Sequence, residues 1–472
     1  MGTKKMTQRH FSAGAGRVDI TPPLTAPIAG WGAQRHVLPD GVEQKLVATV
    51  LVVSDGHETA AFVELELVVI SRAESAAIQQ AVASELGIHP EQVRASISHN
   101  HNGPPPSAWD WIEQGIDALT AYYVTIPFLC AAAARAAQLA QRSAHVGWGR
   151  GECFTAVNRR ETAPGGRTVT GVNPGGRIDP EVLVVRIDDA AGAPIAAIVG
   201  YTMHPTFLGP TNKLLSPDWP GHMRRVFEQA TGAVCLFAQG ATGDIGPGPK
   251  GFTDRIDHVR AIGGQVGCEA ARVWFGIDVP PVRYEHERIW ESGASLGKWK
   301  AVPLPDPDPV VRTMATTVEL PLRPHMPVHE ARAQLDEVLG TLNRLKADGA
   351  PDAEIEAATF ATKRANMALT RSTLYAGQTS TPVALHLLQI GPIVFAGCEG
   401  EPFSQTGMKI KAGSPFEATW FGGYTGGWAG YVPTREEFPR GGYEVDTSPF
   451  TIDAADALAA GTIAALNHLA ES

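Results

Sequence analysis

Cysteine is scarce in this sequence of 472 residues, and no two cysteines form a CxxC pair. A disulfide framework or a cysteine-rich zinc site is therefore not expected, and a reducing compartment fits better. Runs of basic residues are also missing, and the net charge of −10 is spread along the chain. Nucleic-acid phosphates require clustered Lys and Arg, so we expect no nucleic-acid partner, and the same charge argues against docking on anionic membranes.

The sequence also shows no recognisable targeting segment. Lys4 and Lys5 have no apolar run behind them, and no stretch reaches the ~20 apolar residues of a membrane helix. We therefore expect no signal peptide, no stable membrane anchor and a cytoplasmic location. The abundance of Ala, Gly, Pro and Arg is typical of a bacterial source.

Two catalytic signatures are missing as well. The sequence has no glycine-rich phosphate loop with its lysine, and the segment 240–244 (GATGD) lacks the spacing of a nucleotide fingerprint. It has no GxSxG nucleophile elbow, which weakens the hypothesis of a serine hydrolase.

What remains is ordinary globular composition, with 44% apolar and 19% charged residues. The length favours one large catalytic domain over 1–472 with insertions, or two closely packed lobes. Strand and helix patterns alternate irregularly, which predicts an α/β (mixed α+β) fold. Two helical patterns, 328–347 and 352–374, predict an inserted helical hairpin within 328–374.

The hydrophobic periodicity and turn residues also predict the other main elements. Strands are expected at 46–54, 59–70, 93–97, 182–187, 194–201, 234–238 and 384–395, helices at 71–86, 118–143, 254–275 and 451–469, and an exposed connection at 302–310.

Three of these strands end near potential metal ligands. His99 and His101 follow the first, His204 follows the second, and Glu399 or Glu401 follows the third. Loops at strand ends can aim side chains at one point, and zinc accepts imidazole nitrogen and carboxylate oxygen. Isolated histidines are more often hydrogen-bonded core residues, but this combination favours a metal site. Both histidines of the HxH pair could bind metal, or one could bind while the other acts as a base.

The same segments resemble the neutral ceramidases. Residues 98–104 (SHNHNGP) look like the family motif HTHSGP, and 201–206 (YTMHPT) resemble its second zinc-histidine segment. The segment 216–218 (SPD) is similar to the SxD that follows, and 401–404 (EPFS) to EFTT. Residues 430–438 (GYVPTREEF) closely match GYVTTxEEY. The motifs occur in the family's order across nearly the whole chain.

The resemblance implies one Zn²⁺ per chain, held by four side chains: His99, His204, Glu401 and Tyr431. Glu399 is the alternative to Glu401, and Tyr424 is the alternative to Tyr431. A cation stabilises a phenolate, which makes a tyrosine ligand chemically reasonable.

The resemblance also implies catalytic roles. His101 would be the general base that takes a proton from zinc-activated water. Arg159, in the segment 154–159 (FTAVNR), and Tyr443 would donate hydrogen bonds to the oxyanion; Arg160 is the neighbouring alternative.

One departure from the family concerns its GDxSP segment, which here reads GDIGP, with Gly246 in place of the serine. The extra C-terminal β-sandwich of longer members is also missing. Phe438 replaces a tyrosine, and Asn100 and Asn102 replace Thr and Ser. A zinc-dependent amidase acting on a small or medium-sized substrate, not ceramide itself, is therefore our first hypothesis.

Two alternatives stay open: a zinc esterase or lactonase, and a non-catalytic metal-binding protein on the same scaffold. The expected partner is a small-molecule amide or ester, and a homo-oligomer is compatible with the sequence. Loop tryptophans could line a substrate pocket or serve only as packing residues; these are Trp109, Trp111, Trp148, Trp219 and Trp428.

Overall fold

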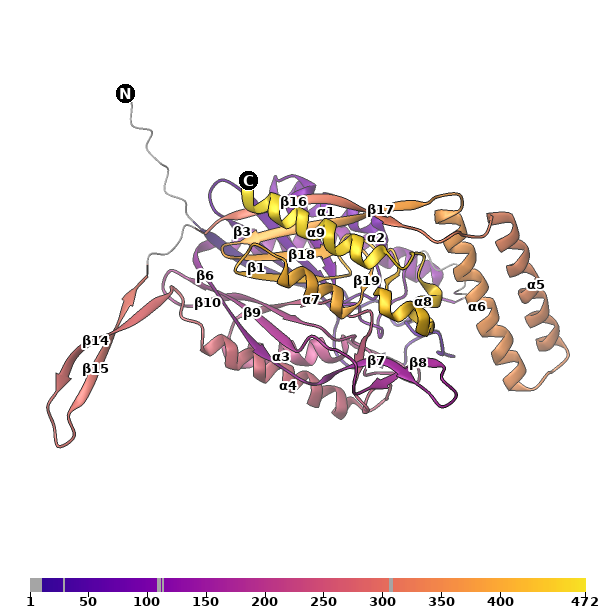
Figure 1. Ribbon diagram of the computed structural model, residues 1–472, viewed down its shortest axis with the longest axis horizontal. Helices are drawn as coiled ribbons and strands as arrows, with labels where there is room; N and C mark the ends of the chain where they lie inside the picture. Colours follow the sequence, from indigo (N-terminus) through magenta and orange to yellow (C-terminus); the bar gives the residue numbers. More distant parts are fainter. Residues whose placement is uncertain (1–10, 29, 108–111, 113, 305–308) are drawn as a thin grey trace, which may run out of the picture.

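Two β-sheets of mainly buried strands form the centre of the molecule (Figure 1). The computed structural model describes residues 11–28, 30–107, 112, 114–304 and 309–472. The larger sheet has the strand order β12 (Val234–Gln239), β10 (Pro194–Tyr201), β9 (Glu181–Asp189), β6 (Arg142–Glu152), β1 (Ser12–Asp19), β3 (Val47–Ser54), β4 (Thr59–Leu65), β5 (Val93–Ile97). The smaller sheet has the order β16 (Val311–Pro321), β17 (Ser380–Ile390), β18 (Ile393–Cys398), β20 (Ala418–Gly422).

The two sheets pack against each other through a shared apolar core that includes Phe62, Val185, Phe395 and Trp420. Helices cover their outer faces. Helices α1 (Arg72–Leu86) and α2 (Ile116–Leu139) bury their apolar sides on the β3–β5 end of the larger sheet, and α3 (Asp218–Thr231) and α4 (Ile256–Phe275) on its β9–β12 end. Helices α7 (Ser404–Ala412) and α9 (Ala454–Glu471) cover the smaller sheet. The arrangement has four layers, and its mixed α/β class is the one that the sequence predicts.

Short elements complete the loops between these layers. They are β2 (Gly41–Val42) with β11 (Leu214–Leu215), β13 (Ile245–Pro247) with β7 (Ala156–Thr162) and β8 (Thr168–Asn173), β19 (Glu401–Pro402) with β21 (Tyr431–Val432), the helix α8 (Tyr443–Thr447), and the 3-10 turns η1 (Pro90–Gln92) and η2 (Arg435–Arg440).

Two hairpins project from opposite ends of the long axis (Figure 1). One is helical, α5 (Val328–Ala347) and α6 (Asp352–Tyr375), and lies where the helical hairpin is expected from the sequence. The other is β14 (Val282–Trp290) with β15 (Leu296–Pro303), here called the arm (residues 282–303), and the sequence patterns did not predict it. Part of the connection expected at 302–310 is the end of β15, and residues 305–308 lie outside the described part of the chain.

Most of the predicted elements are confirmed within a few residues, and the reasons are local. Helix α1 begins at a capping box, in which Ser71 and Glu74 satisfy each other's backbone N–H groups, and it ends at Gly87. The single strand expected at 384–395 was wrong. The chain turns at Gly391, whose φ of 60° suits glycine, so β17 and β18 form a hairpin there.

Helix α2 is the described helix that is long and apolar enough to cross a membrane, with 28% of its most apolar window buried. Length and composition alone are weak evidence, because core helices pass the same test. Its buried residues recur at helical spacing and join the core formed with α1 and the larger sheet, among them Leu119, Ile126, Cys130 and Ala137.

Candidate metal centre and active site

The candidate histidines and Glu401 lie just beyond the ends of β5, β10 and β18, which belong to the two sheets. Strands β4 and β5, β10 and β12, and β18 and β20 are parallel pairs, so their carboxyl ends lie at common edges. The two sheets are tied together at this point, because the Ile97 N–H donates to the Tyr424 carbonyl oxygen and Ser96 bridges Thr425. Loops distant in sequence therefore converge.

Three histidines form the centre of this convergence. The metal-ligating atoms of His99, His101 and His204 all lie within 4.8 Å of one another. His99 Nε2 and His101 Nε2 are 3.1 Å apart, and the rings of His99 and His204 have centroids 4.9 Å apart. His99 and His204 are buried, and His101 is partly buried.

The backbone fixes the tautomer of each ring. The Nδ1 atoms of His99, His101 and His204 lie 2.6, 2.7 and 2.7 Å from the carbonyl oxygens of Val68, Gly30 and Thr242, respectively. A carbonyl oxygen can only accept, so each Nδ1 carries a hydrogen and donates it. In a neutral ring, each Nε2 then presents a lone pair to the centre of the cluster.

The environment keeps these rings neutral. Burial lowers the pKa of His99 to about 4, that of His101 to about 3 and that of His204 to about 4.

Two Nε2 lone pairs that face each other at 3.1 Å repel unless a cation lies between or beside them. His204 Nε2 is buried and has no hydrogen-bond partner among the described residues. This donor set fits a divalent metal ion, because buried imidazole nitrogens without hydrogen-bond partners are what such an ion binds.

Glu401 supplies the anionic side chain of the cluster. Its Oε2 atom lies 3.6 Å from His99 Nε2 and 3.4 Å from His204 Nε2, and its side chain is buried. Trp428 Nε1 donates to its other oxygen at 2.8 Å. Burial alone would raise the pKa of Glu401, but its contacts hold that pKa below the usual range. Glu401 is therefore an ionised carboxylate facing the two histidines.

Tyr431 lies beside Glu401 because the two residues are partners across the short parallel pair β19–β21. Arg159 Nη2 donates to the Tyr431 hydroxyl oxygen at 3.1 Å, and the Tyr431 and Tyr443 rings have centroids 5.7 Å apart. Burial and Glu401 raise the pKa of Tyr431 well above its ordinary value. A cation at the cluster would oppose this shift, because it favours the phenolate.

The oxyanion-binding candidates are held differently. Arg159 is buried, and its Nε donates to Glu444 at 2.8 Å while Nη2 points to Tyr431. Tyr443 is 50% exposed, so it lies at the solvent side of the cluster. Together, the seven residues that the sequence singles out occupy one site.

The alternative ligand and oxyanion-binding residues that the sequence offered either point away from the cluster or support its side chains. Glu399 pairs with Arg72 at 2.6 Å and accepts from the Ala384 N–H, so its carboxylate is engaged outside the cluster. Arg160 pairs with Glu444 and with Glu437.

Tyr424, the alternative to Tyr431, supports the cluster through contacts with His99 and Glu401. Its ring stacks on His99 with centroids 4.2 Å apart, and its hydroxyl lies 2.6 Å from Thr242 Oγ1 and 3.3 Å from Glu401 Oε2.

Backbone strain is concentrated here. His99, Tyr424 and Asp218 have positive φ angles of 64°, 61° and 57°. Such angles cost non-glycine residues on the order of 1 kcal/mol or more and persist only where surrounding contacts hold them. Asp218 shows such contacts, because its carboxylate accepts from Asn102 Nδ2 at 3.2 Å and from the Leu208 N–H at 2.8 Å. It thereby joins the loop that carries His101 to the loop that carries His204.

Sequence reasoning missed several supporting groups. Trp31 packs on the His101 ring with centroids 5.2 Å apart and on Phe252 at 5.6 Å. The Gly30 carbonyl orients His101, and a Cβ at Gly30 would come within 2.4 Å of the His101 carbonyl oxygen. No motif marked this contact; only an aromatic next to glycine in the N-terminal segment hinted at it.

The loop tryptophans differ in what they contact. Trp428 hydrogen-bonds Glu401, as described above. Trp219 is buried in α3, where its Nε1 donates to the His204 carbonyl oxygen at 3.3 Å, and Trp148 packs at the edge of the core between the sheets. Trp109 and Trp111 lie outside the described residues.

Gly246, at the position of the family serine, lies against Arg159. A Cβ there would be 3.0 Å from Arg159 Cβ and 3.4 Å from Arg159 Cδ. A side chain at this position would therefore contact the arginine that donates to Tyr431.

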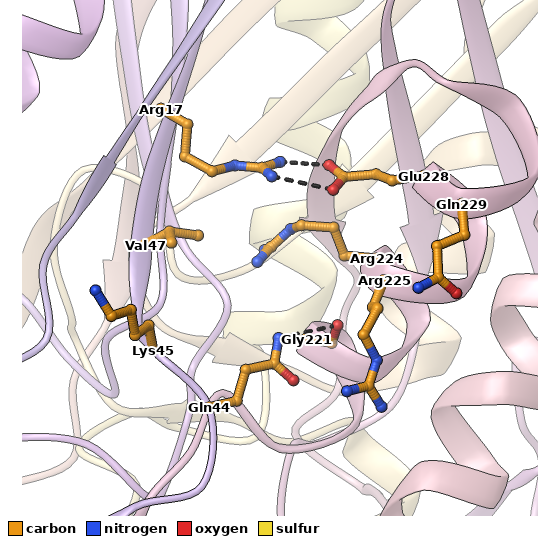
Figure 2. Close-up of a pocket in the computed structure, with 9 residues that line it drawn as sticks. All are labelled: Arg17, Gln44, Lys45, Val47, Gly221, Arg224, Arg225, Glu228 and Gln229. Atoms are coloured by element: carbon orange, nitrogen blue, oxygen red, sulfur yellow. Dashed lines mark hydrogen bonds and ion pairs between the residues drawn. The ribbon is translucent and has the colours of Figure 1, made fainter.

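A cavity of about 480 Å³ lies apart from these residues, between the larger sheet and α3 (Figure 2). Two of its arginines are paired with acids: Arg17 forms two hydrogen bonds to Glu228, and Arg224 pairs with Glu64 and Glu66. None of the seven candidate residues lines it. The histidine cluster, and not this cavity, is therefore the candidate functional site.

Comparisons with known proteins show the family of the chain. A family model described as neutral/alkaline non-lysosomal ceramidase, N-terminal, matches residues 11–260. Neutral ceramidase A of Dictyostelium discoideum is 26% identical over 274 residues, which cover 52% of this chain and 37% of that protein. Neutral ceramidase B of the same organism is 32% identical over 87 residues, covering 16% of this chain and 12% of that protein. The match thus covers little more than a third of the first relative and about an eighth of the second.

Solved structures extend the likeness over the whole fold. The neutral ceramidase of Pseudomonas aeruginosa aligns with a TM-score of 0.67 at 19% identity, over 96% of this chain and 74% of that one. A ceramidase solved in complex with C2 aligns with the same TM-score at 17% identity, over 98% and 76%. Taken with the family model, which spans more than half of the sequence, these findings show that the chain belongs to the neutral/alkaline non-lysosomal ceramidase family.

Proposed function

We propose that this protein is a zinc-dependent hydrolase that cleaves the amide (N-acyl) bond of a small or medium-sized substrate. One observation carries the proposal: three neutral imidazoles, each with Nδ1 committed to a carbonyl oxygen, turn their Nε2 lone pairs toward one point beside an ionised Glu401. Membership of the ceramidase family supports the amide as the bond attacked.

The donor set supports zinc. His99, His204, Glu401 and Tyr431 would hold the ion, since imidazole nitrogen and hard oxygen donors together suit Zn²⁺. A bound zinc would act as a Lewis acid that acidifies water and polarises a carbonyl group.

The proton-transfer role falls to His101. Its Nδ1–H is engaged with the Gly30 carbonyl oxygen at 2.7 Å, so Nε2 is free to accept a proton from water and return it to the leaving nitrogen. In that sequence a C–O bond forms at the carbonyl carbon and the C–N bond breaks. Its partial exposure, in contrast to the burial of His99 and His204, supports a place on the substrate side.

Two donors face the developing negative charge on the carbonyl oxygen. Arg159 is held by Glu444 and stays cationic, and Tyr443 presents a hydroxyl at the exposed side. Fixed donors of this kind stabilise an oxyanion more than the neutral carbonyl. A mere metal carrier would need neither group, which favours catalysis over the non-catalytic alternative.

The substrate is proposed to be smaller than ceramide. Gly246 removes the side chain that would otherwise lie against Arg159. Loss of contacts beside the arginine favours a different hydrogen-bonding pattern on the substrate.

Elemental mass spectrometry of the purified protein tests the metal first. We expect about one zinc per chain in the wild type, none in Glu401→Ala, and an unchanged content in Glu399→Ala as the matched control. Turnover of short N-acyl amides, matching esters and ceramide by the loaded protein then tests the reaction. A protein that binds no metal and acquires none on reconstitution contradicts the proposal. Faster turnover of esters would favour the esterase alternative, and faster turnover of ceramide would contradict the smaller substrate.

A further inference from the structure

The arm is separate from the rest of the molecule (Figure 1). Among the described residues, β14 and β15 form a two-stranded sheet of their own, and their ends meet where the Leu304 N–H donates to the Pro281 carbonyl oxygen at 3.0 Å. A two-stranded hairpin alone is marginally stable in water. A long arm of this kind therefore needs a surface to lie on.

The register of the arm sorts its side chains onto two faces. Tyr284 opposes Ala301, His286 opposes Trp299, and after a bulge Ile289 opposes Gly297. Opposed residues share a face and alternate residues return to it, so these positions lie on one side. The contact of a Gly297 Cβ with His286 and Trp299 agrees with this assignment.

That side, here called the aromatic face, has no Lys, Arg, Asp or Glu. It comprises Val282, Tyr284, His286, Ile289, Trp299, Ala301 and Pro303. Its larger members are open to solvent: Tyr284 and Ile289 are 60% exposed and Trp299 is 62% exposed. An uncharged, aromatic face left open along a whole hairpin is typical of an interaction surface.

The opposite face mixes charged side chains with apolar ones, among them Trp290 and Leu296, which are 54% and 49% exposed. Arg283 pairs with Glu285 at 2.7 Å, and Lys298 Nζ lies 5.2 Å above the Trp290 ring. The two tryptophans of the arm thus lie on opposite faces in different surroundings.

Charge decides against a membrane as the occupant. The arm has four basic residues (Arg283, Arg288, Lys298, Lys300) and three acidic ones (Glu285, Glu287, Glu291), and the chain has a net charge of −10. Anionic lipid surfaces attract segments with a large excess of Lys and Arg, and the basic excess of the arm is small.

We propose that the aromatic face binds a second copy of this chain, in a dimer in which each arm lies on the partner's body. A strand of nine residues is about 30 Å long, so one face of the arm offers roughly 300 Å². One arm-to-arm contact would bury roughly 600 Å², below the range of stable interfaces, whereas reciprocal arms on two bodies bury roughly 1,200 Å² and reach it. The area thus favours reciprocal exchange.

Sedimentation analysis of the full chain over ~0.1–100 µM tests the proposal, since an interface at the lower size limit is expected to be weak. We expect a dimer whose Kd rises at least about 30-fold in Trp299→Glu, the loss typical of a central tryptophan. Trp290→Glu is the matched control on the opposite face, and its Kd should change less than about threefold. Both variants should keep the wild-type melting temperature, because the arm lies outside the cores.

Three results would overturn the proposal. A wild type that is monomeric throughout the range would exclude the dimer, and a dimer unaffected by Trp299→Glu would place the interface elsewhere. Equal weakening by both variants would mean that the aromatic face is not the contact. Co-sedimentation of the wild type, but not Trp299→Glu, with anionic phosphatidylserine vesicles would assign the face to membranes instead. The test reads assembly and is independent of the proposed catalytic function.

Discussion

The histidine cluster and the arm place their side chains in opposite settings. At the cluster, polar side chains are buried and each is oriented by a second group, as His101 is by the Gly30 carbonyl. On the arm, apolar side chains such as Trp299 are open to water. A buried set of converging lone pairs fits a small cation, whereas an open uncharged face fits a large surface. The first is built by contacts between distant segments, and the second by one local hairpin.

Removing a cluster histidine should have the largest effect. In His204→Ala we expect loss of the metal and at least a 1,000-fold loss of turnover, because both the ion and its activating effect disappear. Elemental analysis and an N-acyl amide assay measure the two losses. Full metal content in this variant would show that His204 is not a ligand.

His101→Ala should separate binding from proton transfer. We expect the metal to be retained and kcat to fall by about 10²–10⁴, the usual contribution of a general base. The measurement is the metal content and kcat of the same preparation. If metal is lost here as fully as in His204→Ala, His101 is a ligand, and the base must be sought elsewhere.

Acid should destabilise the metal-free cluster. The pKa of His204 falls from 6.5 to about 4 on folding, so below pH 6.5 the unfolded chain binds the proton and the folded chain does not. Stability is therefore lost as pH falls, by about 2 kcal/mol for this histidine at pH 5. Urea unfolding of the metal-free protein at pH 7 and pH 5 measures it. His204→Asn should lose correspondingly less, and an equal loss in both proteins would contradict the assignment.

Gly246→Ser should have a smaller effect. The added side chain would contact Arg159 at 3.0–3.4 Å, so the arginine must shift by a few tenths of an ångström. We expect unchanged metal content and a change of a few fold, on the order of 1 kcal/mol, in the ratio of kcat/KM for ceramide and short amides. Equal ratios in wild type and variant would show that this position does not select the substrate.

Removing the arm should affect catalysis least. The Pro281 and Leu304 backbones are hydrogen-bonded, so a short Gly-Ser turn can replace residues 282–303. We expect zinc content and turnover of the monomeric variant to stay within about twofold of the wild type, as for sites with no shared contacts. Loss of turnover with intact folding would mean that the two regions are coupled through the partner subunit.

The sequence singled out the residues of the candidate site better than the groups that support them. His99, His101, His204 and Glu401 could be found because each follows an apolar strand that local patterning makes recognisable. Trp31 and the carbonyl groups of Val68, Gly30 and Thr242 could not, since a backbone oxygen has no sequence signature. Asp218 stood in a recognised motif, but its link to Asn102 and Leu208 depends on a fold that brings three loops together.

The arm is an element of the fold that the sequence did not predict. Charged residues occupy many of the alternate positions of its strands. In addition, a bulge between His286 and Arg288 interrupts the alternation of period two by which a strand is recognised in a sequence. The single strand expected at 384–395 failed for a related reason, because a tight turn at Gly391 interrupts one continuous apolar run.

By itself, the sequence determined the mixed α/β class, most element boundaries and the residue types of the candidate metal site, because these follow from periodicity, caps and short motifs. Only the tertiary structure decided that Glu401 and not Glu399 faces the histidines, that Arg159 and not Arg160 contacts Tyr431, and that all three rings share one tautomer. Those outcomes depend on which way side chains point once the loops of two sheets meet. Neighbouring residues of the same type differ in this respect only after the chain has folded.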